Sequence, residues 1–182
     1  GNVLLDAVAG SLIANADIVS GTGQLTLKAQ SNITLNGGVE VATATDGTIS
    51  LNAVTGTLTM AGDATVTATG SSARLAAQGN ITVGNVTADD VSLLSRNGAI
   101  VNAVDSTMNV TAENLRLEAE SSIGEASNHL TTTVDVITAL SETGSIFITE
   151  ADGVTVDDVT VSVTEFTAAA GTGTATDDAQ SD

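Results

Sequence analysis

The chain contains no cysteine, proline, tryptophan or tyrosine, and its only aromatic side chains besides one histidine are Phe147 and Phe166. Without cysteine the fold has neither disulfides nor thiolate metal ligands, so backbone hydrogen bonds and packing have to stabilise it. Without proline every backbone N–H beyond the first residue is available to a neighbouring strand. The scarcity of aromatic rings removes the platforms on which polysaccharide-cleaving enzymes hold sugars.

Basic residues are also scarce, because 4 Lys and Arg stand against 22 Asp and Glu, which gives a formal net charge of −18. Residues 1–104 hold 7 acids and 3 basic residues (net −4), whereas residues 105–182 hold 15 acids and 1 basic residue (net −14). Such a surface repels phosphate backbones and anionic lipids, so we expect no nucleic-acid partner and no membrane insertion. The charge is typical of a well-solvated exterior.

Helical periodicity is missing as well, since no segment of eleven or more residues keeps an apolar stripe at positions i, i+3, i+4 and i+7. The chain instead holds 29 threonines and 18 glycines. Threonine and valine fit the pleated surface of a strand, and glycine supplies tight corners. The composition therefore predicts an all-β protein.

A repeat of 24 residues separates Leu27, Leu51 and Leu75, each at the centre of an apolar-x-Leu-x-Ala pattern. Related patterns lie upstream and downstream, and the last three central residues follow at steps of 18, 24 and 31 residues. The seven copies centre on Leu5, Leu27, Leu51, Leu75, Leu93, Leu117 and Ile148. Alternating strands at this period predict a solenoid, in which each repeat buries its apolar face against its neighbours.

Two further strands are predicted in each repeat. The second is clearest in the pair Ile33-Thr34-Leu35 and Ile81-Thr82-Val83, two periods apart, and the intervening copy around Leu58 is displaced by one residue. The third is indicated by Val39-Glu40-Val41, Ala64-Thr65-Val66, Met108-Asn109-Val110 and Val159-Thr160-Val161. Three strands per turn predict a parallel β-helix of about seven coils of ~24 residues, with coils ~4.8 Å apart.

The domain boundary is predicted near residue 167. Residues 1–167 are assigned to the β-helix, whereas residues 168–182 lose the alternation, are rich in small and acidic residues, and are predicted to form a flexible linker or tail. An uncapped solenoid exposes strand edges, so we expect either end-to-end association or a terminal cap formed by residues beyond Phe166. The chain starts at Gly1 without a signal peptide, and we expect it to be an internal part of a longer protein.

One region resembles a known family of proteins. The segment Glu120-Ser121-Ser122-Ile123-Gly124-Glu125-Ala126-Ser127-Asn128-His129-Leu130 is followed by Val134-Asp135-Val136 and by Gly144-Ser145-Ile146-Phe147-Ile148-Thr149-Glu150-Ala151. This order is similar to repeats of filamentous haemagglutinin-like bacterial surface proteins, with His129 where proline is frequent. The resemblance covers Val3 to Val163. It implies a right-handed β-helix within a very large secreted or surface-attached protein, whose repeats form the shaft.

Catalysis is not expected. One outward position of the aligned first strands carries Thr26, Ser50, Arg74, Ser92, Arg116 and Phe147, which is neither a threonine array nor an acid–base pair. Arg74 and Arg116 lie two coils apart there, and we interpret them as surface charges between acidic neighbours. The acidic pairs at positions 89–90 and 157–158 point to opposite faces in a strand or are solvated in a corner. We therefore predict that the protein is not an enzyme.

Two candidate binding sites remain. The long step between Leu117 and Ile148 predicts a protruding loop or a longer coil over residues 121–144, and Asn128 and His129 are its candidate contacts for a glycan or a host protein. Calcium is the candidate cation, at Asp152, Asp157 and Asp158 around a glycine corner. Neither an EF-hand spacing nor a glycine-rich calcium repeat is present, so a solvated acidic corner is the simpler interpretation, and no cofactor is expected.

Together with the solenoid pattern, the resemblance implies a structural and adhesive shaft segment of a giant bacterial protein, located outside the cell or on its outer surface. Its expected partners are neighbouring repeats of the same long chain, or a second copy bound through the coil ends. Two alternatives stay open. One is a module that binds glycans or host proteins through residues 121–144, and the other is the subunit of a self-assembling extracellular filament.

Overall fold

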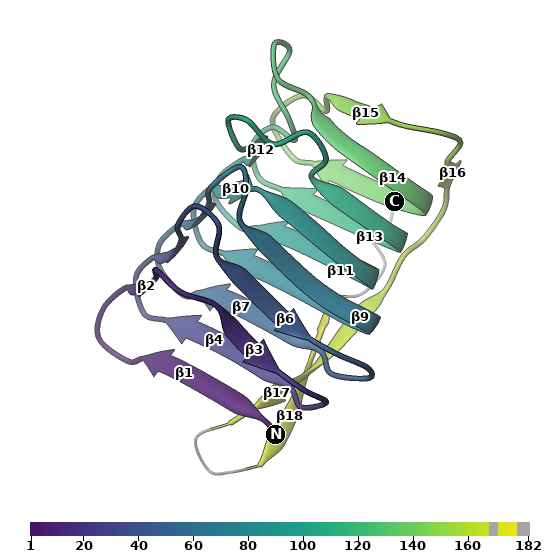
Figure 1. The fold of residues 1–182 in the computed structure, drawn as a ribbon. Coiled ribbons are helices and arrows are strands. Elements are labelled where there is room, and N and C mark those ends of the chain that lie inside the picture. The colour runs from purple at the N-terminus through teal and green to yellow at the C-terminus, as the bar shows by residue number, and fades with distance from the viewer. Residues whose placement is uncertain (168–170, 178–182) are drawn as a thin grey trace.

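The computed structural model describes residues 1–167 and 171–177, and the description below refers to these residues. They contain strands and turns and no helix. Parallel strands stack as a β-solenoid of about seven coils, which confirms the predicted fold class (Figure 1). No described segment is a helix long and apolar enough to cross a membrane.

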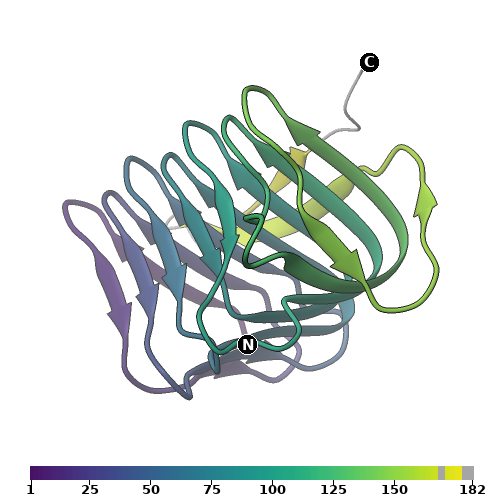
Figure 2. The same ribbon diagram turned by 90° about the horizontal axis from the view of Figure 1, so that it is seen from above.

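Each coil contributes to three faces of the solenoid. The first face consists of β1 (Val3–Ala7), β4 (Leu25–Ala29), β7 (Ile49–Ala53) and the second halves of β9 (Thr65–Ala77), β11 (Asn85–Ser95), β13 (Val110–Ala119) and β14 (Leu130–Ser141). The second face consists of β2 (Leu12–Ala14), β5 (Ile33–Leu35), β8 (Leu58–Met60), β10 (Ile81–Val83) and β12 (Ile100–Asn102). The third face consists of β3 (Ile18–Ser20), β6 (Glu40–Thr43), the first halves of the four long strands, and β15 (Ile148–Glu150). Figure 2 shows the corners of successive coils aligned along the stack.

The register of the first face follows the leucine repeat. The residues aligned from coil to coil are Leu5, Leu27, Leu51, Leu75, Leu93, Leu117 and Ala139. The first six positions are as predicted, but the prediction of Ile148 as the seventh was wrong. Ile148 pairs with Leu130 on the third face, and Ile146 bridges Ile123 on the second face. The last step is therefore 22 residues rather than 31, because alanine takes the place of leucine.

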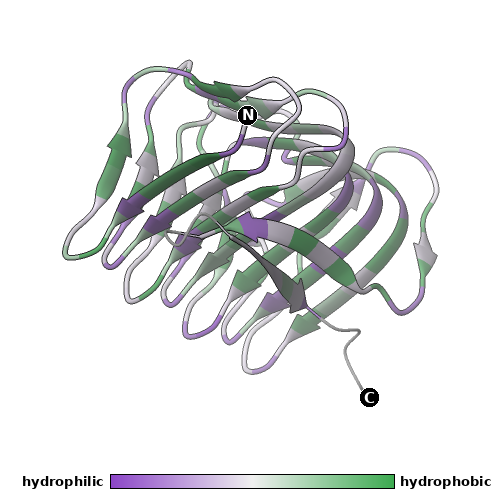
Figure 3. Cartoon of the chain, turned by 90° about the horizontal axis from the view of Figure 1, so that it is seen from below, coloured by the Kyte–Doolittle hydropathy of each residue, from purple (hydrophilic) through white to green (hydrophobic). Residues whose placement is uncertain are grey.

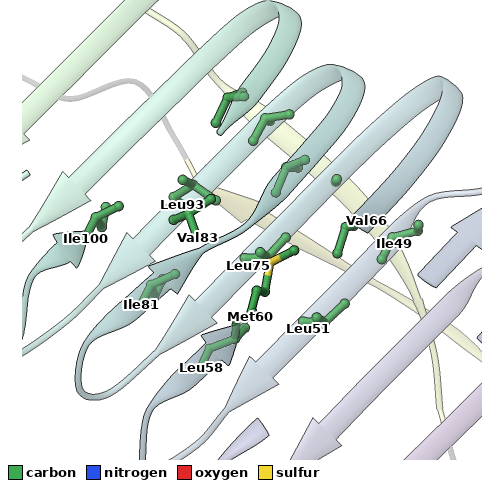
Figure 4. Close-up of a cluster of buried hydrophobic side chains, with 14 of the residues drawn as sticks. Ile49, Leu51, Leu58, Met60, Val66, Leu75, Ile81, Val83, Leu93 and Ile100 are labelled. Carbon is green, nitrogen blue, oxygen red and sulfur yellow. The ribbon is translucent and has the colours of Figure 1, made fainter. Parts of the chain in front are cut away.

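Inward-pointing aliphatic side chains form one continuous core along the stack (Figure 4). Leu51, Leu75 and Leu93 are each 0 % exposed, and Ile81 and Ile100 fill the same interior from the second face. Burial of a leucine or isoleucine side chain stabilises the fold by about 1.5–3 kcal/mol relative to exposure. The core is long and narrow, so each coil depends on the coils directly above and below it.

Asparagine side chains bridge successive coils at the corner between the first and second faces. Asn32 Oδ1 accepts a hydrogen bond from Thr57 N at 2.9 Å, and Asn80 Oδ1 accepts one from Ala99 N at 3.0 Å. These contacts satisfy a backbone donor that lies outside the strand ladders. They also bring the asparagine against the glycine of the next coil, which is why the corner has no room for a side chain there.

Replacement of Gly98 by alanine is expected to lower the free energy of unfolding by about 1–3 kcal/mol. A Cβ atom at this position would lie 2.3 Å from Asn80 Oδ1 and 2.6 Å from Asn80 N, so the corner would have to shift. Gly10→Ala is the matched control, because a Cβ at Gly10 meets nothing within 4 Å. Urea unfolding followed by circular dichroism would compare the two variants. Equal midpoints would contradict the close packing of this corner.

The last strands leave the solenoid and return along its side. After β15 the chain forms β16 (Thr155–Val156), which pairs with β14, and then β17 (Val161–Phe166) and β18 (Thr172–Asp177). These last two strands are antiparallel and form a sheet of their own, the C-terminal hairpin. Figure 3 shows this hairpin lying across the strands of the stack.

The hairpin corrects two predictions. Val159-Thr160-Val161 was predicted as a third-face strand, but Val161 begins β17 and pairs with Asp177. Residues 168–182 were predicted as a flexible tail, whereas Thr172–Asp177 form a strand. Residues 168–170 and 178–182 lie outside the described part of the chain. In β18, threonines alternate with glycine, alanine and aspartate rather than with large apolar residues. The strand therefore lacks the apolar–polar alternation from which strands were predicted.

Both ends of the stack are open. At the first coil, Leu5 is 40 % exposed although its neighbour in the next coil, Leu27, is 0 % exposed. At the last coil, Ile146, Val154 and Val156 are exposed. β17 contacts β4, β7, β9 and β11 on the side of the stack, and Asp177 of β18 binds Arg74 and Ser92 there, so the described residues beyond Phe166 do not form the predicted terminal cap. The expectation of end-to-end association stays a prediction.

Candidate functional site

The most elaborate polar site of the described chain lies on the outer side of the first face. Five side chains point outward there from successive coils, and we call them the outward row: Thr26, Ser50, Arg74, Ser92 and Arg116. All five are buried, with Arg74 and Arg116 each 5 % exposed. The interpretation of these two arginines as surface charges was therefore wrong. The C-terminal hairpin covers β4, β7, β9 and β11 on this side.

The centre of the site is a two-point ion pair between Arg74 and Asp177. Arg74 Nε donates to Asp177 Oδ2 at 2.9 Å, and Arg74 Nη2 donates to Oδ1 at 3.0 Å. Ser92 Oγ donates to Oδ2 at 2.6 Å. Both charged side chains are 6 % exposed. A buried guanidinium and carboxylate in this fork geometry satisfy each other's charge and fix each other's orientation.

Further along the hairpin, hydroxyl groups of the solenoid contact the backbone of β17. Phe166 N donates to Thr26 Oγ1 at 2.8 Å. Thr48 Oγ1 lies 2.9 Å from Thr164 N and 2.7 Å from Thr164 O. A strand that crosses the stack cannot join its parallel ladders, so side-chain hydroxyls take the place of backbone partners.

The acidic side chains of the hairpin face the solenoid. Ser50 Oγ donates to Glu165 Oε1 at 2.6 Å, which makes Glu165 the second carboxylate, after Asp177, that the outward row binds. Between them, Val161 and Val163 are buried at 0 % and 1 % exposure. The alternation of β17 therefore places valine, valine and glutamate against the solenoid. The outward row thus binds the carboxylates of the hairpin through serine hydroxyls and the guanidinium of Arg74, and the valines of β17 are buried beside these contacts.

Arg116 extends the row by one coil. Its Nη2 lies 2.5 Å from Glu118 Oε2, which is two residues away on the same strand and therefore on the same face. Ser92 stands between Arg74 and Arg116 in the register, so the two arginines are separated by one coil, as the sequence predicts.

Sequence reasoning found the five positions of the outward row but not the hairpin that covers them. It was wrong to add Phe147 to the row, because Thr138 is the residue that pairs with Arg116 in the next coil. Asp177 lies 103 residues after Arg74, and no repeat pattern connects them. One signal was present: Thr172, Thr174 and Thr176 alternate with small or acidic residues, as in a two-sided strand. The alternation of Val161 and Val163 suggested a strand but could not indicate its antiparallel partner.

The predicted loop over residues 121–144 is much smaller in the structure. Leu130–Ser141 form β14, which continues the ladder of β13. The part that leaves the ladder is a tight turn in which Glu125 N and Asn128 O, and Asn128 N and Glu125 O, are 3.1 and 3.0 Å apart. Of the predicted contacts, Asn128 is half-buried and its Nδ2 donates to Asn102 O at 3.1 Å, whereas His129 is exposed.

His129 takes part in the one ring-to-ring contact recorded for the described chain. Its imidazole stacks on Phe147 with the ring centroids 5.8 Å apart and an interplanar angle of 29°. His129 Nδ1 lies 2.9 Å from Thr149 Oγ1. The pair presents a small aromatic surface at the corner of the last two coils.

The three acids predicted for calcium lie in an exposed segment around β16. Asp152 Oδ1 accepts a hydrogen bond from Gly153 N at 2.9 Å, and Asp157 Oδ1 accepts one from Asp158 N at 2.8 Å. These bonds are local turn contacts of the aspartates. Within residues 1–167 and 171–177, no group of three or more His, Cys, Asp or Glu side chains is placed to hold a metal ion.

An apolar hollow lies at the last coil, where no further coil covers the core. It is lined by Ile137, Ala139, Ile146, Ile148, Glu150, Val154 and Val156. Its walls are the inner residues of β14 and β15 and the segment around β16. Most of these lining side chains are aliphatic, as in the core of the inner coils, so the aliphatic side chains of another coil could pack against them.

No family model matches the sequence, and no curated protein and no solved structure matches it either.

Proposed function

We propose that this chain is a segment of a rigid shaft in a large bacterial protein exported to the cell surface, where it acts as a spacer in adhesion. The proposed role is mechanical rather than catalytic. Strand ladders run along the whole stack, and the aliphatic interior resists bending because it is close-packed. The resemblance to filamentous haemagglutinin-like repeats is consistent with this role.

The observation that carries the proposal is the open apolar core at both ends of the stack. Leu5 at one end and Ile146 and Val156 at the other are exposed, although the equivalent positions of inner coils are buried. A coil added at either end would cover these side chains and pair the free strand edges. Such ends suit a segment within a longer solenoid.

Replacement of Val156 by lysine is expected to weaken self-association of the isolated chain at least tenfold. Val156 is 80 % exposed beside the apolar hollow of the last coil, and a charge there would have to be desolvated when a second copy stacks on this end. Val104→Lys is the matched control, because Val104 is 79 % exposed in a corner between coils. Sedimentation over a range of concentrations would measure the association.

The form of the association separates two hypotheses. Discrete, weak association through the ends supports a shaft segment whose natural neighbour is the next repeat. Growth into ever longer oligomers without a limiting size favours the alternative of a filament subunit, because head-to-tail contacts between unlike ends form an open filament rather than a closed ring. A chain that stays monomeric at high concentration, with Val156→Lys unchanged from the parent, would contradict the use of the ends.

A second candidate function rests on the stacked rings of His129, which is exposed, and Phe147, which is half-buried. Stacked rings beside hydroxyl groups can hold a sugar face, so we propose glycan or host-protein binding at this corner as the alternative. A glycan and host-surface panel, run in calcium and again in chelator, tests it. Saturable binding that is lost in His129→Ala but kept in Lys28→Ala would support a binding module. Silence in both conditions would contradict it, whereas binding that is lost in chelator would show that it requires calcium.

A further inference from the structure

The C-terminal hairpin is a separate unit that is bound to the solenoid rather than built into it. β17 and β18 pair with each other over six residue pairs and join no strand of the solenoid. Side chains of the solenoid or of the hairpin take part in each contact of this attachment: the ion pair of Arg74 with Asp177, the hydroxyl bonds of Thr26, Thr48, Ser50 and Ser92, and the buried valines of β17. A unit of this kind can leave the surface without breaking a ladder.

Most of the segment that connects the hairpin to the last coil is exposed, although Val159, just before the hairpin, is buried. Residues 151–158, which we call the connector, are all exposed. Its contacts with the stack are few: the pairing of β16 with β14, a hydrogen bond from Ala151 N to Thr132 O at 2.9 Å, and one from Asp157 N to Ile137 O at 3.2 Å. Release of eight residues gives a reach of about 26–29 Å.

The outward row needs an acidic occupant. Without the hairpin, the guanidinium of Arg74 and the hydroxyls of Ser50 and Ser92 would form a hydrogen-bonding stripe on an otherwise acidic protein. The hairpin of a second copy offers the same carboxylates, valines and backbone groups as the chain's own hairpin. Exchange of an identical element between copies loses no contact and therefore costs little.

We propose that the outward row is a docking site for the C-terminal hairpin of a second copy, and that two chains couple side by side by reciprocal exchange of their hairpins. The chain's own hairpin occupies the site in the monomer, and the connector is the hinge. This inference does not depend on the shaft proposal. In a longer assembly, the exchange of hairpins would link solenoids side by side, whereas contacts between coil ends would lengthen each solenoid.

Two charge-reversed variants of the full chain test the exchange. R74D and D177R each place like charges opposite one another, so neither variant can seat its own hairpin. In a mixture, the hairpin of R74D matches the site of D177R, and the hairpin of D177R matches the site of R74D. We expect native mass spectrometry to show a 1:1 complex of twice the 17.9 kDa chain mass, at least tenfold more abundant than any dimer of either variant alone.

The double variant R74D/D177R is the control for folding, because it restores an opposite-charge pair within one chain. With Val156→Lys added to suppress association through the coil ends, it is expected to be monomeric, with the hairpin docked. A mixture that stays monomeric while the double variant docks its hairpin would overturn the proposal. A dimer from either single variant alone that persists when Val156→Lys is added would also overturn it, because the contact would then lie neither at the hairpin nor at the coil ends.

A variant that keeps every contact of the site gives a second test, independent of how the single variants fold. Deletion of residues 151–154 removes half of the connector and shortens its reach by about 13–14 Å, which is expected to prevent the hairpin from docking on its own chain. We expect this variant to form a closed dimer in which the amides of β17 and β18 stay protected from hydrogen exchange. A monomer, with the hairpin either docked or free, would contradict the exchange.

Discussion

Replacement of Leu75 by alanine is expected to lower the free energy of unfolding by about 2–5 kcal/mol. Leu75 is 0 % exposed in the fourth coil, and its inward side chain touches the coils on both sides. Removal of its outer carbons leaves a cavity that the ladders cannot close, because their spacing is set by backbone hydrogen bonds. Equilibrium unfolding in urea, followed by far-ultraviolet circular dichroism, would measure the loss.

Leu5→Ala is the matched control for this prediction. Leu5 has the same position in the first coil but is 40 % exposed, so its truncation is expected to cost about 1 kcal/mol or less. The difference between the two variants reports how open the first coil is. Equal losses would mean that the first coil is as enclosed as the fourth, which would contradict an open-ended stack.

Replacement of Asp177 by alanine is expected to release the C-terminal hairpin while leaving the solenoid folded. The substitution leaves the buried guanidinium of Arg74 without its carboxylate, and an uncompensated buried charge costs about 3–5 kcal/mol. The hairpin can avoid this cost by undocking, which hydrates Arg74. Amide hydrogen exchange would show this as faster exchange in β17 and β18, by about two to three orders of magnitude, with β7 unchanged.

The control for Asp177→Ala is Asp89→Ala, which removes one negative charge from an exposed position. It is expected to leave the exchange rates of the hairpin unchanged, because surface substitutions away from such contacts have small effects. If Asp177→Ala also left them unchanged, the ion pair would contribute nothing to docking. The assignment of the outward row as the seat of the hairpin would then be wrong.

The repeat unit could be predicted from the sequence because burial imposes it at every coil. Leu27, Leu51 and Leu75 occupy inward positions whose neighbours above and below are also leucines, so their spacing follows the closure of each coil. The prediction failed where small residues take the same place. Ala139 follows Leu117 in the register, but an alanine between Thr138 and Leu140 gave no signal, and the Ile146-x-Ile148 pattern was chosen instead.

The candidate site was harder to predict because its parts are distant in the chain. The outward position of Arg74 followed from the repeat, but its burial depends on a strand that lies 103 residues later and runs across the stack. Outward polar side chains are ordinarily solvated, so Thr26, Ser50 and Ser92 carried no hint of a cover. The contact between the hairpin and the outward row is tertiary, and no local pattern encodes it.

The central claim is that ladders between successive coils carry load along the stack. Because the chain has no cysteine, single thiol handles can be introduced at Gly10 in the first coil and Glu142 in the last, and the protein can be pulled between them. We predict a clear force threshold followed by stepwise lengthening, with about 80 Å gained for each coil of ~24 residues that unravels. Gradual lengthening from the lowest forces, without a threshold or steps, would contradict a rigid shaft.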